Sequence, residues 1–96
     1  MTLKEFKVQL ALGSFTTDDL IDIAGDTNTS KKLLKILSNH EYAPIRSWVA
    51  KNSNTPKDVL EKLSNDEYWA VRENVANNPN RPITSNDGVA NGGKAK

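Results

Sequence analysis

Apolar side chains recur every three or four positions from the N-terminus to about residue 82, which is the spacing of amphipathic helices. A first helix is predicted from Leu3 to Leu12, because Thr2 and Glu5 form a capping-box pattern and Gly13 follows. A second, shorter helix is predicted between Phe15 and Gly25, with acidic residues in its first turn. No segment shows the alternation of a β-strand. The pattern therefore predicts an all-α fold.

The strongest feature of the chain is an internal repeat. Leu37 to Pro56 (LSNHEYAPIRSWVAKNSNTP) returns 26 residues later as Leu63 to Pro82 (LSNDEYWAVRENVANNPNRP), with eleven of twenty aligned residues identical. Thr27 to Ser30 aligns with Ser53 to Pro56 at the same offset, so a weaker copy precedes the first. Such a period is typical of stacked helical units. We expect one helical-repeat domain over residues 1–82, with units at about 16–36, 37–62 and 63–82, and a flexible tail over 83–96.

Each unit is predicted to contain two short helices. In the full copy, Thr55 is expected to cap the first helix and Pro56 to occupy its first position. The second helix is predicted over Glu67 to Ala76. The N-terminal helix can cap the array by turning Leu3, Phe6 and Leu10 inward. The positions predicted to be buried are Val59, Leu60 and Leu63 in the first helix, Tyr68, Val71 and Val75 in the second, and Tyr42, Ile45 and Val49 one unit earlier.

The segment V-R-E-N-V-A-N-N-P-N-R-P, residues 71–82, resembles the core of the leucine-rich repeat variant unit of bacterial and phage proteins, which is itself similar to HEAT-type repeats. The resemblance covers about residues 20–82. It implies a short right-handed α-solenoid of helix pairs and a family that mostly serves as binding surface. The chain departs from the pattern where Ser53 replaces the proline seen at Pro79, and where His40 occupies the position of Asp66.

The side chains that differ between the copies are the candidates for partner binding. Trp48 corresponds to Asn74, and Trp69 corresponds to Ala43, so neither indole belongs to the repeated pattern. Tryptophan is enriched both in packed cores and in interfaces, and both uses stay open at this stage. A non-catalytic module for protein–protein interaction or scaffolding is the first functional hypothesis. Its candidate residues are Trp48, Trp69, Ser47, Glu73 and Asn74.

Charge supplies a second hypothesis. The chain carries a formal net charge of +1, yet five cations oppose Glu41 alone between Lys31 and Lys51. The segment EYWAVRENVA also resembles repeats of HEAT-like DNA alkylation-repair proteins, which hold the DNA backbone on a basic concave surface. The alternative function is therefore nucleic-acid backbone binding, although the small net charge counts against it. The candidate basic face consists of Lys31, Lys32, Lys35, Arg46, Lys51 and Arg72.

The repeated arginines, Arg46 and Arg72, allow two interpretations. Each follows a predicted core position, so its guanidinium could bond loop carbonyls or a carboxylate of the neighbouring unit. Alternatively, both could line one face and bind phosphate or a partner's carboxylate.

Catalytic, metal and cofactor sites are not expected. The chain has one histidine, His40, and no cysteine, so a histidine metal cluster or a Cys–His pair cannot be assembled within it. The N-terminus lacks the apolar run of a signal peptide, and no segment has the length of a membrane span. We therefore expect a non-enzymatic cytoplasmic protein. We also expect apolar surface near Trp69 and Val75 at the C-terminal end, where a homodimer or a partner could dock.

Overall fold

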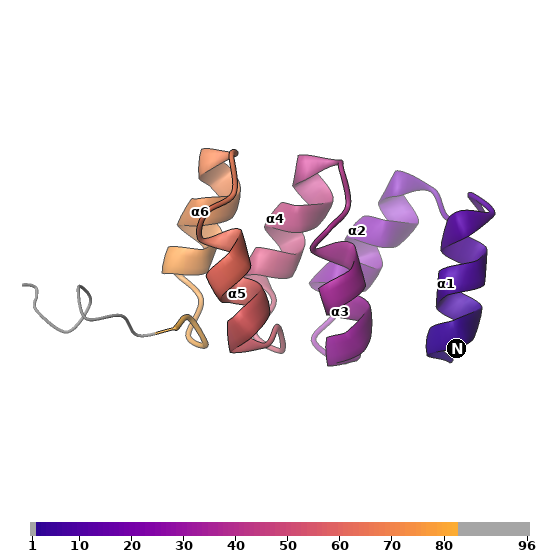
Figure 1. The fold of residues 1–96 in the computed structure, drawn as a ribbon, viewed down its shortest axis with the longest axis horizontal. Coiled ribbons are helices and arrows are strands. Elements are labelled where there is room, and N and C mark those ends of the chain that lie inside the picture. Colours follow the sequence, from indigo (N-terminus) through magenta and orange to yellow (C-terminus); the bar gives the residue numbers. More distant parts are fainter. Residues whose placement is uncertain (1, 83–96) are drawn as a thin grey trace, which may run out of the picture.

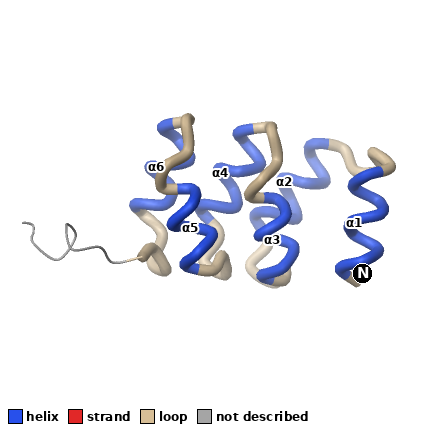
Figure 2. The backbone as a smooth tube through the Cα atoms, viewed as in Figure 1, coloured by secondary structure: helices blue, strands red, loops and turns tan. Residues whose placement is uncertain are grey.

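The computed structural model describes residues 2–82 and contains only α-helices as regular structure within that range (Figures 1 and 2). This confirms the predicted all-α class. The predicted tail, residues 83–96, lies outside the described residues. The helices are α1 (Leu3–Ala11), α2 (Thr17–Gly25), α3 (Lys31–Leu37), α4 (Ala43–Lys51), α5 (Lys57–Leu63) and α6 (Trp69–Ala76).

The helices lie in two rows, which Figure 1 shows one behind the other. In one row, which we call the second row, α2 packs against α4, and α4 packs against α6. The other row contains α1, α3 and α5. Helix α3 contacts α1, α2 and α4, while α5 contacts α4 and α6. Helix α4 therefore contacts α2 and α6 in its own row and α3 and α5 in the other row.

Capping boxes begin the first two helices. The Thr2 hydroxyl accepts a bond from the Glu5 N–H at 3.0 Å, and the Glu5 carboxylate accepts one from the Thr2 N–H at 2.8 Å. Thr16 and Asp19 repeat the arrangement at the start of α2, at 3.1 and 3.0 Å. These bonds satisfy N–H groups that have no partner within the helix. Gly13 then turns the chain after α1 with a φ of 71°, in the left-handed region that glycine adopts without strain.

One apolar cluster runs through both rows. Burial of these side chains is the main source of the fold's stability. The predicted buried positions of the two copies are confirmed except for the tyrosines. The buried apolar residues are Phe6, Leu20, Ala24, Leu34, Leu37, Ile45, Val49, Ala50, Val59, Leu60, Leu63, Val71 and Val75.

The predicted cap at Thr55 is wrong. The residue at the cap of α5 is Pro56, and Thr55 is fully buried. The Thr55 hydroxyl donates to the carbonyl of Val49 at 2.7 Å, as the Thr29 hydroxyl does to Ile23 at 2.6 Å. Each threonine therefore closes the last turn of the preceding helix, where carbonyls have no helical partner.

Tyr42 and Tyr68 were predicted to be buried, and that prediction is also wrong, since they are 46% and 52% exposed. Both residues stand at helix caps with extended backbone, and α6 begins at Trp69 rather than at residue 67. A residue outside the helix does not follow the helical period, so the buried stripe does not extend to it. Val75 is 4% exposed, so the expectation that it lies in water at the C-terminal end is wrong as well.

Candidate functional site

Two buried asparagines join the ends of the second-row helices. The side-chain amide of Asn52 donates to the carbonyls of Ala24 and Asp26 at 2.7 and 2.9 Å. Asn78 repeats both bonds one copy later, to Ala50 and Asn52 at 2.8 and 2.9 Å. Each amide donates to two carbonyls at the end of the neighbouring helix of the row. These carbonyls receive no hydrogen bond from within their own helix, because they lie at its C-terminal end. The repeated asparagines are therefore ties within the fold.

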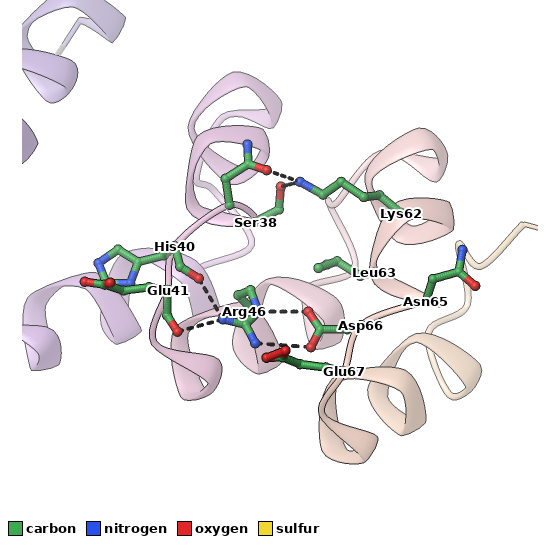
Figure 3. Close-up of a pocket in the computed structure, with 10 residues that line it drawn as sticks. Ser38, His40, Glu41, Arg46, Lys62, Leu63, Asn65, Asp66 and Glu67 are labelled. Atoms are coloured by element: carbon green, nitrogen blue, oxygen red, sulfur yellow. Dashed lines mark hydrogen bonds and ion pairs between the residues drawn. The ribbon is translucent and has the colours of Figure 1, made fainter.

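Arg46 also links the two copies, through hydrogen bonds of its guanidinium (Figure 3). Its Nε and Nη2 donate to the carboxylate of Asp66 at 2.8 and 3.1 Å. Its Nη1 donates to the carbonyls of His40 and Glu41, each at 2.8 Å. The Arg46 and Asp66 side chains are 11% and 9% exposed. This guanidinium is used inside the fold, as the first interpretation of the repeated arginines expected.

The hollow around this pair has a volume of about 540 Å³ and lies where the α3–α4 and α5–α6 loops meet (Figure 3). Lys62 reaches across it and donates to the Ser38 hydroxyl at 2.9 Å and to the Asn39 side-chain oxygen. Burial lowers the pKa of Lys62, and the nearby charges of Lys35 and Arg46 lower it further. Within residues 2–82 no buried side-chain nitrogen or oxygen lacks a hydrogen-bond partner. The hollow is thus a polar joint whose groups bind one another.

Asp66 gives this joint a pH dependence. Burial acts to raise the pKa of Asp66, but the hydrogen bonds from Arg46 and from the Tyr68 N–H, with the charges of Arg46 and Arg72, hold it below its ordinary value. A lowered pKa means that the stabilisation is complete above the ordinary carboxyl pKa near about 4 and is lost as the pH falls through the folded-state value.

We therefore expect Asp66→Asn to cost about 1.5 to 3 kcal/mol at neutral pH, the range for hydrogen bonds to charged groups. The difference from the unchanged protein should shrink as the pH falls below about 4, because the unchanged protein then loses the ion pair that the variant lacks at every pH. Urea unfolding of both chains, at neutral pH and at a pH below about 4, measures the difference in the free energy of unfolding. Asp58→Asn is the matched control, because Asp58 lies 3.9 Å from Lys35 with both side chains 68% exposed. Such a surface pair contributes little. A constant difference at both pH values would contradict the assignment.

Arg72 corresponds to Arg46 but lacks its carboxylate. Its Nη1 donates to the carbonyl of Asp66, which matches the bond from Arg46 to His40. Its Nε and Nη2 have no hydrogen-bond partner within residues 2–82. The repeated arginines therefore differ in use, and Arg72 presents two free donors.

The six residues of the candidate basic face come from helices of both rows. Lys31, Lys32 and Lys35 belong to α3, whereas the other three belong to α4 and α6 in the opposite row. Several are already engaged: the Lys31 ammonium donates to Asn54 at 2.6 Å, and Lys51 lies 5.0 Å from the centre of the Trp48 ring. Lys31 and Lys51 are therefore partly occupied by contacts within the fold.

Trp48 lies across the junction of α2 and α4. A Cβ at Gly25 would stand 3.1 Å from Cε3 of the indole, so the ring packs against the glycine backbone. Even so, Trp48 remains 40% exposed. One side of the ring is therefore used in packing, and the exposed part leaves the interface use a prediction.

Two of the shallow hollows that Trp48 lines lie beside the helices of the second row. One, of about 320 Å³, lies between α4 and α6, and the other, of about 240 Å³, lies over α2. We call the residues that line them the Trp48 face. They are Ala43, Pro44, Ser47, Trp48, Tyr68 and Ala70 around the first hollow, and Ile21, Asp22, Gly25 and Asp26 with Trp48 around the second.

The structure divides the five candidate partner-binding residues. Ser47 and Trp48 lie on the Trp48 face. The Asn74 amide donates to the Ser47 carbonyl at 3.0 Å, so Asn74 joins α6 to α4. Trp69 and Glu73 lie on another, exposed side of α6. Tyr68 was not predicted to be a surface residue, although its place directly after the loop was a signal that it could precede the helix.

Among residues 2–82, no three His, Cys, Asp or Glu side chains are grouped so that they could hold a metal ion. The helices of this part of the chain are too short and too polar to cross a bilayer. No protein-family model matches the chain, and the searches of curated proteins and of solved structures find no similar protein. The resemblance to leucine-rich repeat variant proteins therefore stays a prediction.

Proposed function

We propose that the chain is a non-catalytic helical-repeat module that binds a protein partner through the Trp48 face. In this proposal the helices form a short right-handed α-solenoid, α1 caps its N-terminal end, and the protein acts in the cytoplasm, where a chain without cysteine needs no oxidising environment. The two rows of helices and the 26-residue repeat support the first of these statements.

One observation carries the functional proposal. The repeated polar residues Asn52, Asn78 and Arg46 are used in ties between helices. The non-repeated Trp48 instead stands between two hollows and keeps 40% of its surface exposed. Solvent-exposed aromatic side chains beside shallow apolar hollows are the usual anchors of protein interfaces. A binding role therefore explains the part of the chain that the fold does not require.

The test is a selection of random peptides displayed on phage against the full chain, followed by titration of the enriched peptides. We expect Trp48→Ala to weaken their binding at least about tenfold, because truncation of a hot-spot residue costs about 2 kcal/mol or more and each 1.4 kcal/mol is about tenfold. Amide chemical shifts should change around Gly25, Ser47 and Ala70, which line the two hollows.

Val8→Ala is the matched control, since Val8 is an apolar residue 47% exposed on α1, away from the face. This variant should bind as the unchanged chain does. Peptides that bind the Trp48→Ala chain equally well would contradict the proposal. Retention on DNA at low salt with a steep loss as salt rises, together with shifts on α3, would favour the nucleic-acid function instead.

A further inference from the structure

Helix α6 has an exposed side that no described residue covers. Trp69, Arg72, Glu73 and Ala76 are all exposed and follow one another at helical spacing, so they form a single stripe. Trp69 is 66% exposed, which is unusual for the largest apolar side chain. We call these residues the outward face of α6.

The corresponding stripe of α4 is covered. Its residues, 26 positions earlier, are Ala43, Arg46, Ser47 and Ala50, and α6 packs against them. Arg46 binds Asp66, the Ser47 carbonyl accepts from Asn74, and the Ala50 carbonyl accepts from Asn78.

The same stripe of α2 is covered by α4 in turn. Leu20 and Ala24 are buried there, at 4% and 0% exposure, and the Ala24 carbonyl accepts from Asn52. An alanine thus occupies the same place in all three helices, at 24, 50 and 76, where a small side chain lets the next helix approach. The outward face of α6 therefore occupies the place at which a further helix would pack.

The chemistry of this face is self-complementary. It carries one large aromatic ring, one cation with two free donors and one anion directly beside it. In a two-fold contact every group meets a group of the same surface, so a face with adjacent opposite charges can satisfy both of them. A carboxylate suits the free donors of Arg72, as the pairing of Arg46 with Asp66 illustrates, and Glu73 of a second copy supplies one.

We propose that the outward face of α6 binds the same face of a second copy of this chain. The contact buries Trp69 of both copies and pairs Arg72 of each copy with Glu73 of the other. It lies apart from the Trp48 face and does not depend on the function proposed for that surface. Because a single short helix face is small, the complex is weak, as small interfaces usually are.

A head-to-tail stack of copies is less favourable. It would place α2 of the next copy against α6. Asp26 of that copy would then occupy the position that Asn52 and Asn78 hold within the chain. A carboxylate has no N–H to donate to the two carbonyls that an asparagine amide satisfies there, and its charge would repel them.

Charge reversal tests the two-fold contact. The R72E and E73R variants each place like charges opposite one another twice, so each should self-associate at least about tenfold more weakly than the unchanged chain. A mixture of the R72E and E73R chains should associate again, because every charge then meets its opposite. Sedimentation velocity on the full chain up to about 1 mM measures all three, a range suited to weak complexes. Circular dichroism confirms that each variant is folded.

Three results would overturn the proposal: an unchanged chain that stays monomeric at every concentration, single reversals that do not weaken the dimer, or a mixture that fails to associate although both chains are folded. Trp69→Ala should abolish the dimer while it leaves peptide binding at the Trp48 face intact. Failure of one proposal is therefore distinguishable from failure of the other.

Discussion

Asn52→Asp is expected to destabilise the fold by about 3 to 5 kcal/mol at neutral pH, as removal of a buried group's polar partner with introduction of an unpaired charge typically does. The change conserves shape but removes both N–H groups that bind the carbonyls of Ala24 and Asp26 at 2.7 and 2.9 Å. It also places a negative charge beside two carbonyl oxygens at a position that is only 3% exposed.

The effect should depend on pH in a defined direction. The surroundings of the introduced carboxyl raise its pKa above the ordinary value, because they disfavour the charged form. The destabilisation is therefore complete at neutral pH and is relieved as the pH falls through that raised pKa. Denaturant unfolding at neutral and acidic pH measures the change.

The chain contains its own control for this experiment. Asp26 stands at the position equivalent to Asn52, is exposed, and its carboxylate accepts the Asn28 N–H at 2.8 Å. No earlier helix presents carbonyls to it in the way that α2 presents them to Asn52. Asp26→Asn should therefore change the free energy of unfolding by less than about 0.5 kcal/mol, the range for surface substitutions. Equal effects of the two changes would mean that Asn52 is not a tie.

Leu60→Ala is expected to cost about 2 to 5 kcal/mol, the range for leucine truncation in a packed core. Leu60 is fully buried in α5 and belongs to the cluster that joins both rows. The loss includes the transfer of the removed methyl groups and the cavity that remains, since the neighbouring helices relax only partly.

The matched control is Leu12→Ala, which removes the same atoms from a leucine that is 71% exposed after α1. It should leave the free energy of unfolding nearly unchanged. Thermal or urea unfolding of both variants decides the point. A loss at Leu12 as large as that at Leu60 would show that the two residues are not placed as described.

Most of the fold could be predicted from the sequence because the two copies of the repeat can be aligned with each other. Leu37 with Leu63 and Val49 with Val75, which are large aliphatic residues in both copies, are buried in both. The tyrosines Tyr42 and Tyr68 are repeated as well, yet they are exposed, since repetition records equal surroundings and not burial. Helix starts were placed one or two residues early for a related reason, because caps depend on backbone geometry that periodicity does not contain.

The candidate sites were harder to predict. The sequence could identify Trp48 as unusual, but only the packing against Gly25 shows which part of the ring is free. Arg46 and Arg72 are identical in pattern and differ in use, because the carboxylate of Asp66 comes from the following copy. A contact between units depends on what the next unit carries, and the sequence around either arginine alone does not contain it.

Buried asparagine amides tie α4 to α2 and α6 to α4. Hydrogen exchange of side-chain amides, followed by NMR, tests this most directly. We expect the Nδ2 protons of Asn52 and Asn78, which are 3% and 2% exposed, to exchange far more slowly than those of the exposed Asn28. Exchange at Asn52 and Asn78 as fast as at Asn28 would contradict it.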